Sequence, residues 1–411
     1  MSYIEKSEQN LIHTYNRFPV VFEKGEGVFL YDENGKEYLD FASGIGVCSL
    51  GYGNEKINNA IKEQTDMLLH TSNLFYNKPV ADAAEKLVKA TGLKKAFFTN
   101  SGAEAIEGAL KVAKRYAYDK SAAKENDDFS EGYEVIAMNN SFHGRTKGAL
   151  EITGTDSYRK PFGPDINDVK FAEFNNLDSV KELVTDKTCA IVVECVQGEG
   201  GVTPADEDFI KGIRALCDEK DIIMICDEIQ CGMGRTGKMF AYEHYEVKPD
   251  VVTCAKALGC GVPVGAFVCG EKCMDTLVPG DHGTTYGGNP LVTAVVSKVF
   301  DIYEEDLVVE HAKVMGDYLT EELEKIAFEF NSVVKRKGMG LMQGLELRVP
   351  VGDIVNEALE NGLVVISAGG NVLRMMVKRM APFLLNMTVF ISKLLNSELM
   401  ASILTVVTLI L

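Results

Sequence analysis

The chain has 411 residues, 46% of them hydrophobic and 25% charged, which is typical of a large globular protein with enough apolar material for two domains. Its formal net charge of -18 argues against nucleic acid or an anionic membrane as the main partner. The ten cysteines include no Cys-x-x-Cys pair, so the sequence predicts no metal site, no redox pair and a reducing cytoplasm. The first ten residues contain no apolar core of a secretory signal.

Strands and helices alternate through most of the chain. Near the N-terminus, an Asn-Gly dipeptide between two apolar runs predicts a β-hairpin within residues 25–41. Further strands are predicted over residues 96–100, 134–138, 189–194, 222–227, 250–254 and 264–268, with helices over 104–118 and 207–219. Residues 120–131 are polar and are predicted to form a surface loop. This order predicts an α/β fold, with a mostly parallel sheet covered by helices on both faces.

The polar residues that could carry chemistry fall at the ends of these predicted strands. They are Ser101, His143, Glu194, Asp227 and Lys256. The carboxyl ends of parallel strands meet at one edge of a sheet, which is where active sites form in such folds. Lys256 stands between a buried strand and a glycine-rich segment, an unusual place for a solvated surface lysine. The sequence therefore predicts one active site assembled from distant segments.

Three segments have features of phosphate-binding loops. Residues 100–104 follow a strand and open a helix, whose N-terminus favours an anion, although Asn and Ser also cap helices without a ligand. Residues 232–239 nearly fit the Walker A pattern, but Met239 stands where Mg²⁺ needs Ser or Thr. Residues 259–265 have one residue too many for a dinucleotide turn, and no helix follows them. The second and third patterns argue against a nucleotide hydrolase and a dinucleotide fold.

Taken together, these segments resemble the class III aminotransferases, which are pyridoxal-phosphate enzymes of fold type I. The motifs that carry the resemblance are Ser101-Gly-Ala-Glu104, Phe142-His-Gly-Arg145, Asp227-Glu-Ile-Gln230, Lys256 and Thr284-Thr-Tyr-Gly-Gly-Asn289. The resemblance extends over about residues 14–374. Softer features at residues 15–19, 198–201 and 370–374 are most similar to the members that act on acetylornithine. The resemblance to the family implies a large cofactor-binding domain over residues 55–305 and a smaller α+β domain built from residues 1–54 and 306–374.

The resemblance also implies a cofactor site. Lys256 is then the covalent anchor of pyridoxal 5'-phosphate and the general base, with burial favouring its neutral amine. Asp227 would pair with the pyridine nitrogen of the cofactor. The other implied cofactor contacts are Ser101, Gly102 and Ala103 at the phosphate, Phe142 stacked on the ring, Gln230 at the phenolic oxygen, and Thr285 at the phosphate in a neighbouring subunit. A contact from Thr285 would make the protein a homodimer with shared active sites.

The implied substrate residues are Arg145, Glu199, Thr284 and Arg374. Arginine binds a carboxylate in a planar, bidentate way. Arg145 would hold the distal carboxylate of the substrate and Arg374 the α-carboxylate of the acceptor, while Glu199 masks Arg374 when the amino donor is bound. The implied reaction moves the terminal amino group of N-acetylornithine to 2-oxoglutarate in arginine biosynthesis. Donors such as ornithine, 4-aminobutyrate or succinyldiaminopimelate stay open, as does an aminomutase, and Glu194 has either a supporting role or a structural one.

The sequence departs from the family in two places. Ala257 and Cys260 stand where the family usually has glycine. After Arg374 the periodicity is poor, and residues 375–411 form an atypical apolar tail, which we interpret as a reading-frame change near residue 375. Residues 399–411 are apolar but too short for a normal membrane span. An altered C-terminus leaves open an inactive protein that retains the cofactor fold.

Overall fold

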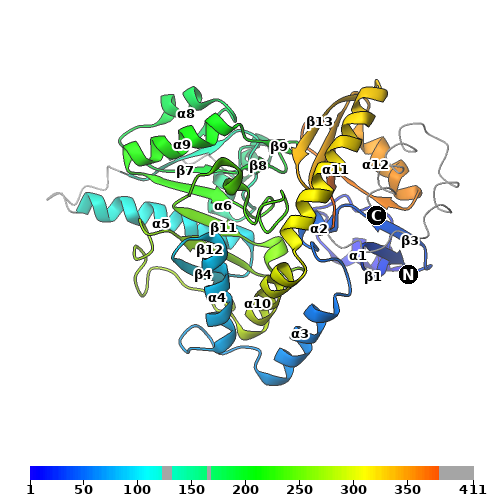
Figure 1. Cartoon of the computed structure of the whole chain (residues 1–411), viewed down its shortest axis with the longest axis horizontal. Helices are drawn as coiled ribbons and strands as arrows, with labels where there is room; N and C mark the ends of the chain where they lie inside the picture. Colours follow the sequence, from blue (N-terminus) through cyan, green and yellow to red (C-terminus); the bar gives the residue numbers. More distant parts are fainter. Residues whose placement is uncertain (123–131, 164–167, 379–411) are drawn as a thin grey trace.

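The computed structural model describes residues 1–122, 132–163 and 168–378, and its larger unit is built on a seven-stranded sheet (Figure 1). The strand order is β4-β12-β11-β10-β7-β5-β6. The bounds are β4 (Lys95–Thr99), β5 (Glu134–Met138), β6 (Val169–Ala172), β7 (Thr188–Val193), β10 (Ile223–Asp227), β11 (Val251–Cys254) and β12 (Gly265–Cys269). Only β12 among these strands runs against its neighbours, pairing antiparallel with β11 and β4. The predicted α/β fold with a mostly parallel sheet is confirmed.

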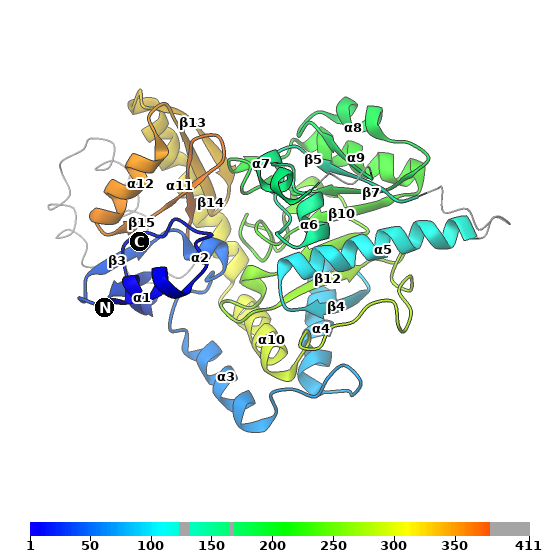
Figure 2. The same cartoon turned by 180° about the vertical axis from the view of Figure 1, so that it is seen from behind.

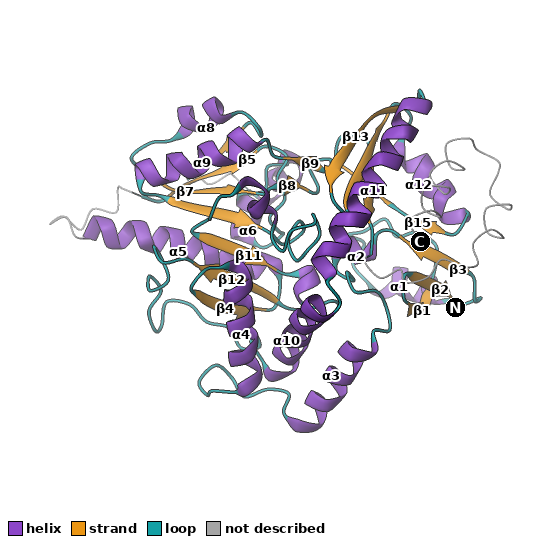
Figure 3. Cartoon of the chain, viewed as in Figure 1, coloured by secondary structure: helices purple, strands orange, loops and turns teal. Residues whose placement is uncertain are grey.

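Both faces of this sheet are covered by helices, because alternate side chains of each strand point to opposite faces. In β10, Ile223 and Ile225 pack in one apolar cluster, which includes residues of α5 (Gly102–Ala122). Met224 and Cys226 pack in the other cluster, on the opposite face. That face is covered by α4 (Lys78–Thr91), α8 (Leu177–Leu183), α9 (Glu207–Lys220) and α10 (Pro290–Glu305). Figure 3 shows the sheet between these helical layers.

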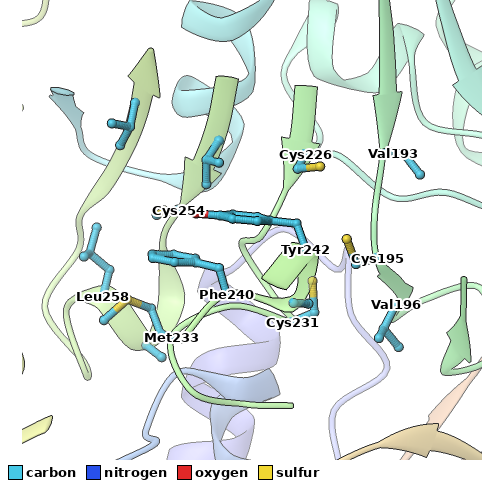
Figure 4. Packing of buried hydrophobic residues seen from close by; sticks show 14 of the residues in the cluster. Val193, Cys195, Val196, Cys226, Cys231, Met233, Phe240, Tyr242, Cys254 and Leu258 are labelled. Carbon is cyan, nitrogen blue, oxygen red and sulfur yellow. The ribbon is translucent and has the colours of Figure 1, made fainter. Parts of the chain in front are cut away.

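The cysteines serve this packing. Cys195, Cys226, Cys231 and Cys254 are buried among apolar side chains, together with the stacked rings of Phe240 and Tyr242 (Figure 4). All ten cysteines lie in the described part of the chain, and all ten are free thiols. Buried thiols behave as small apolar groups, which accounts for scattered cysteines without a pairing pattern.

Most predicted elements agree with the structure to within one or two residues. The predicted hairpin is formed by β2 (Phe29–Asp32) and β3 (Glu37–Asp40), which pair antiparallel around Asn34 and Gly35. The prediction of a loop from residue 120 is wrong at its start, because α5 continues through Ala122, and residues 123–131 lie outside the described residues. β6, whose four residues include a lysine, is not among the predicted strands.

The smaller unit contains segments from both ends of the chain, which lie side by side in both views (Figures 1 and 2). One sheet has the order β1-β2-β3-β15 and pairs β15 in parallel with β3, whereas the other has the order β13-β14-β17-β16. The bounds are β1 (Phe22–Glu26), β13 (Val333–Met339), β14 (Met342–Leu347), β15 (Leu363–Val364), β16 (Ile366–Ala368) and β17 (Val372–Met376), with helices α11 (Val308–Glu329) and α12 (Val351–Glu360). The fold type I arrangement therefore includes a small α+β unit from both termini. The boundaries at residues 54, 305 and 374 stay a proposal.

The remaining elements connect or cover these units. They are α1 (Tyr3–Asn10), α2 (Ser43–Gly46), α3 (Glu55–Met67), α6 (Lys147–Glu151), α7 (Asp156–Arg159), β8 (Val196–Gln197), β9 (Thr203–Pro204), and the 3-10 helices η1 (Lys160–Phe162), η2 (Ala241–Tyr245) and η3 (Lys256–Leu258). Among the described residues, no helix has the length and apolar character needed to cross a membrane.

The start of the predicted atypical tail is part of the folded structure. Met375 and Met376 belong to β17 and are fully buried. Lys378 follows, and its Nζ lies 2.6 Å from Oδ2 of Asp40, with both side chains buried. This ion pair joins the end of β17 to the N-terminal segment. Residues 379–411, which hold the rest of the tail, lie outside the described residues. The reading-frame change near residue 375 stays a prediction.

Candidate active site

A cavity of about 420 Å³ opens at the carboxyl edge of the parallel strands. All five of the polar strand-end residues line it, as the sequence predicted: Ser101, His143, Glu194, Asp227 and Lys256. Gly102, Ala103, Phe142 and Gln230 also contribute to the wall. Because β12 runs antiparallel, the loop of residues 261–264 before it reaches the same edge and closes one side of the cavity.

Lys256 stands at the start of η3, directly after β11, with a positive φ of 48° that non-glycine residues rarely adopt. Its side chain is partly exposed because it faces the cavity, while the surrounding protein removes it from bulk water. Burial lowers the pKa of Lys256. The charge of Glu199 opposes this shift, and the charge of Arg374 adds to it. The geometry therefore favours a neutral amine, which is the nucleophilic form.

Asp227 is the last residue of β10, and its buried carboxylate is fully engaged. Oδ1 accepts hydrogen bonds from the Ile229 amide at 3.0 Å and from Thr253 Oγ1 at 3.2 Å. Oδ2 lies 2.7 Å from Nδ1 of His143. These contacts hold the carboxylate at the cavity wall, facing a position where a cationic nitrogen could be bound.

His143 is predicted to lie at the site, but the sequence assigns it no function. Burial lowers the pKa of His143, but the hydrogen bond and charge of Asp227 outweigh it and the net pKa is raised. Among the described residues, Nε2 of His143 has no hydrogen-bond partner. Burial also raises the pKa of Glu194 to about 7, against the charge of His143. Glu194 accepts hydrogen bonds from the amides of Phe142 (3.2 Å) and Gly198 (3.4 Å), so it also supports the cavity wall.

The segment at the N-terminus of α5 combines a helix cap with a cradle for an anion. Ser101 Oγ accepts the amide hydrogen of Glu104 at 3.2 Å, and Glu104 Oε2 accepts that of Asn100 at 2.8 Å. A Cβ on Gly102 would lie 2.8 Å from the side chain of Ile229, so a larger residue there would require Ile229 to move. The residues that cap α5 can therefore also lie at a phosphate site. The N-terminus of this 21-residue helix is directed at the cavity, where it would favour an anion.

Glu199, Gln230 and Arg374 form a hydrogen-bonded group near Lys256. Nη1 of Arg374 lies 2.5 Å from Oε1 of Glu199 and 3.2 Å from Oε1 of Gln230. Burial raises the pKa of Glu199, but the charge and hydrogen bond of Arg374 outweigh it and lower the net pKa. Arg374 comes from β17 and the other two residues from the larger unit, so only the fold brings them together.

The other predicted substrate and cofactor residues lie outside the cavity wall. Arg145 is exposed and lies against the ring of Phe142, with 5.5 Å from its Cζ to the ring centroid. Thr284 Oγ1 accepts a hydrogen bond from Nδ2 of Asn100 at 3.2 Å, next to the cradle. Thr285 is exposed. The described residues that line the cavity of this chain include none of these three, and neither Glu199 nor Arg374 is among them.

The Walker-like segment has a packing role in the structure. Arg235 within it is buried, and its Nη1 donates a hydrogen bond to the carbonyl of Val377 at 2.5 Å. Glu228, just before it, accepts the amides of Ala241 and Tyr242 at 2.8 and 2.9 Å. Through Arg235, the segment therefore packs against the end of the smaller unit.

The two departures from the family pattern beside Lys256 are accommodated. Ala257 is buried. Cys260 has a φ of 45°, a left-handed conformation that glycine adopts more easily. Its Sγ lies 3.2 Å from Oγ of Ser49 and 3.2 Å from the carbonyl oxygen of Ala257. Cys260 itself is not among the described residues that line the cavity.

The cavity residues fit pyridoxal phosphate. A helix N-terminus suits the phosphate, the buried Asp227 carboxylate suits a protonated pyridine nitrogen, and Phe142 offers an aromatic face. Lys256 offers an amine with a lowered pKa. Together these four features provide the groups that a pyridoxal-phosphate site requires.

Known proteins are similar to this chain in sequence and in fold. Residues 12–381 match the family model described as aminotransferase class-III. The chain is 45% identical to an acetylornithine aminotransferase of Methanocaldococcus jannaschii over 373 residues, which are 91% of this chain and 92% of that protein. It is also 45% identical over 365 residues to an acetylornithine aminotransferase of Aquifex aeolicus, covering 89% of this chain and 93% of that protein.

Solved structures give the same result. An ornithine aminotransferase from Toxoplasma gondii superposes with a TM-score of 0.87 at 29% identity, covering 99% of this chain and 93% of that one. An N-acetylornithine aminotransferase from Stenotrophomonas maltophilia superposes with a TM-score of 0.79 at 32% identity, covering 99% and 100%. With this sequence identity, fold and cavity, the chain belongs to the class III aminotransferases, pyridoxal-phosphate-dependent enzymes of fold type I.

Proposed function

We propose that this chain is a cytoplasmic enzyme of arginine biosynthesis that moves the terminal amino group of N-acetylornithine to 2-oxoglutarate. The products are N-acetylglutamate semialdehyde and glutamate. The observation that carries the proposal is the Glu199–Arg374 ion pair beside Lys256, because it equips one cavity for an ω-amino donor and an α-oxo acid. The names of the relatives at 45% identity support the same donor.

The side chains divide the work of the reaction. When bound, pyridoxal phosphate supplies an electrophilic carbon and a ring that delocalises the charge left on the deprotonated substrate carbon. Nζ of Lys256, whose lowered pKa favours the neutral amine, would accept the proton from the carbon that carries the amino group, and it is the group positioned to return that proton. Asp227, held by His143, presents its negative charge to the pyridine nitrogen. Ser101, Gly102 and Ala103 would hold the phosphate, Phe142 the ring and Gln230 the phenolic oxygen.

The carboxylate-binding residues select between donor and acceptor. N-acetylornithine has no carboxylate beside its reacting amine, so Glu199 stays on Arg374 while the donor is bound. The α-carboxylate of 2-oxoglutarate then replaces Glu199 as the bidentate partner of Arg374. Arg145 would hold the distal carboxylate of either substrate, and Thr284 lies close enough to Asn100 to support the same wall.

Replacing Glu199 by alanine should reverse this selection. Arg374 would then be a buried cation without a carboxylate partner, which attracts a carboxylate next to the reacting group and disfavours a donor that has none at that position. We expect the KM for N-acetylornithine to rise about tenfold, which corresponds to ~1.4 kcal/mol, while glutamate becomes a better donor in the reverse half-reaction. Steady-state kinetics with each donor measure this, and Glu199→Gln, which removes only the charge, is the matched control. An equal loss of activity with both donors would contradict the proposal that Glu199 covers Arg374 while N-acetylornithine is bound.

We further propose that the enzyme is a homodimer in which Thr285 reaches the phosphate site of the partner subunit. Leu74, Phe75 and Tyr76 are large and 88%, 67% and 106% exposed. Asn73 ties this segment to the loop that carries Thr285 by donating hydrogen bonds to the carbonyls of Thr284 (3.3 Å) and Gly287 (2.9 Å). An apolar patch of this kind is typical of a protein–protein interface, and a second copy would cover it.

Phe75→Glu should therefore produce a monomer that has lost most of its turnover, although Phe75 lies outside the cavity wall of its own chain. A charge buried in the interface costs several kcal/mol if it has no partner. Analytical ultracentrifugation and a transaminase assay measure the two effects. Phe328→Glu is the control, because Phe328 is 95% exposed on α11 in the smaller unit, and it should remain dimeric and active. A monomeric variant with full activity would rule out shared sites.

The donor is tested directly on the pyridoxal-phosphate-loaded protein. Its visible absorbance should be lost on addition of N-acetylornithine and much more slowly with ornithine or 4-aminobutyrate at equal concentration. Faster loss with one of the other two would assign that donor instead. If no absorbance appears after loading, the chain with its altered C-terminus does not hold the cofactor covalently, and the proposal that it is an active enzyme is wrong.

A further inference from the structure

The guanidinium of Arg145 lies between two aromatic rings. Its Cζ is 3.8 Å from the ring centroid of Tyr158 and 5.5 Å from that of Phe142. The two rings meet edge to face, with centroids 6.2 Å apart and an interplanar angle of 87°. No carboxylate of the described residues lies within 4.0 Å of this guanidinium. Arg145 is thus a cation with an aromatic contact in place of a counter-ion.

The short helix that carries Tyr158 is anchored to the larger unit. It belongs to α7, and the next residue, Arg159, is buried and anchors this short helix. Nη1 of Arg159 donates a hydrogen bond to the carbonyl of Thr153 at 2.5 Å, and its guanidinium lies 4.1 Å from the ring centroid of Phe171 in β6. The backbone that carries Tyr158 is therefore anchored to the sheet, and the ring itself contacts Phe142 and Arg145.

The backbone on both sides of Arg145 is fixed to the same frame. Before it, the amide of His143 donates a hydrogen bond to Thr153 Oγ1 at 3.0 Å. After it, Oε1 of Glu107 accepts hydrogen bonds from Thr146 Oγ1 at 2.7 Å and from the Gly148 amide at 2.9 Å. The backbone anchors of Arg145 and Tyr158 thus share Thr153. What remains for the exposed Arg145 side chain is its direction, and the described contacts that limit it are the two rings.

We propose that Tyr158 is a positioning residue, which holds Arg145 ready for the distal carboxylate of the substrate. An aromatic face attracts a cation without neutralising it, so all the guanidinium donors stay available to a carboxylate. A carboxylate partner in place of Tyr158 would compete with the substrate. The inference rests on the substrate clamp of the proposed function and deepens it, because it makes Tyr158 a determinant of selectivity for dicarboxylates.

The test compares two ligands that differ only in the distal carboxylate, 2-oxoglutarate and 2-oxobutyrate. Neither reacts with the pyridoxal-phosphate form in the absence of an amino donor, so calorimetric titration of the loaded full-length protein gives dissociation constants. Tyr158→Leu should raise the dissociation constant of 2-oxoglutarate by up to about fivefold and leave that of 2-oxobutyrate unchanged, since a cation–π contact at an exposed site contributes up to about a factor of five. Tyr158→Phe, which retains the ring, should stay within about twofold of the unsubstituted protein.

Several results would overturn the inference. One is an equal loss for both ligands, which indicates a merely structural role, and another is a Phe variant as weak as the Leu variant, which assigns the effect to the hydroxyl. Unchanged binding by Tyr158→Leu, or no preference for 2-oxoglutarate in the unsubstituted protein, would also overturn it. Melting temperatures check the fold of each variant. Tyr158→Gln, which lacks an aromatic face, replaces Leu if that variant does not fold, and the same outcomes apply.

A second arm separates this inference from the proposed donor. N-acetylornithine and N-acetylputrescine share the reacting amine and the amide, but only the first has a carboxylate. Tyr158→Leu should lower kcat/KM for N-acetylornithine about fivefold through KM and leave N-acetylputrescine unaffected. If the unsubstituted protein turns over neither donor while the 2-oxoglutarate preference depends on Tyr158, the donor assignment fails and the inference stands. Loss of both donors to the same extent in Tyr158→Leu counts against the inference.

Discussion

Replacing Lys256 by alanine should abolish the visible absorbance of covalently held pyridoxal phosphate and lower the turnover by at least about 10⁴-fold. No other lysine is among the described residues that line the cavity, so the amine has no substitute as covalent anchor or proton carrier. The measurements are an absorbance spectrum after loading with cofactor and a single-turnover assay with N-acetylornithine. If the absorbance persists in the variant, the assignment of Lys256 is wrong.

The pH dependence of the donor half-reaction is a second test of the role of Lys256. The pKa of Lys256 is lowered by burial, so its neutral form becomes populated at a lower pH than for an ordinary lysine. Since the neutral amine is the active form, the rate of the donor half-reaction should rise as pH rises through this lowered pKa. A pH profile between about 6 and 9 tests the direction. Lys272→Ala is the control, because Lys272 contacts Asp221 and the Ile222 carbonyl near the opposite end of β10.

Replacing Asp227 by asparagine should lower kcat by about 10² to 10³-fold, the size of effect seen when a charge directed at a reacting group is lost. The amide can retain hydrogen bonds to Ile229 and Thr253, but it cannot neutralise a cationic ring nitrogen. The pKa of His143 should fall as well, because the charge of Asp227 is what raises it against burial. Kinetics and a fluorescence titration of cofactor binding measure the first effect. NMR titration of the histidine resonances measures the second.

Asp250→Asn provides a matched comparison. Asp250 is also a buried carboxylate next to β10, where it accepts the Met224 amide at 2.8 Å and pairs with Arg214 at 3.0 Å, at the opposite edge of the sheet. This variant should lower the melting temperature and keep the kcat of the unsubstituted protein. Equal losses of kcat in the two variants would mean that Asp227 acts through stability alone.

Local patterns in the sequence were sufficient for the larger unit and for part of the site. Apolar runs of four to six residues identified most strands of the seven-stranded sheet, because strands buried on both faces have little other composition available. The rule that parallel strands end at one edge placed Asp227 and Lys256 in the same cavity. The missed strand, β6, is only partly buried, and its pattern is therefore weak.

The contacts between the predicted residues required the structure. His143 follows Phe142 in a motif, but nothing in the local pattern indicates that its ring pairs with Asp227, 84 positions away. Tyr158 lies outside every quoted motif, and its stacking on Arg145 depends on how α7 is anchored by Arg159. The pairing of β15 with β3 likewise joins residues more than 300 positions apart.

By itself, then, the sequence determined the α/β architecture and the edge where chemistry occurs, because these depend on short-range periodicity and on residue type. The role of Lys256 was implied by the resemblance to the class III aminotransferases. Only the tertiary structure decided which groups neutralise one another: His143 with Asp227, Glu199 with Arg374, and an aromatic ring rather than a carboxylate beside Arg145. Charge and proton affinity depend on distances of a few ångströms between residues far apart in the chain, and those distances are set by packing rather than by local sequence.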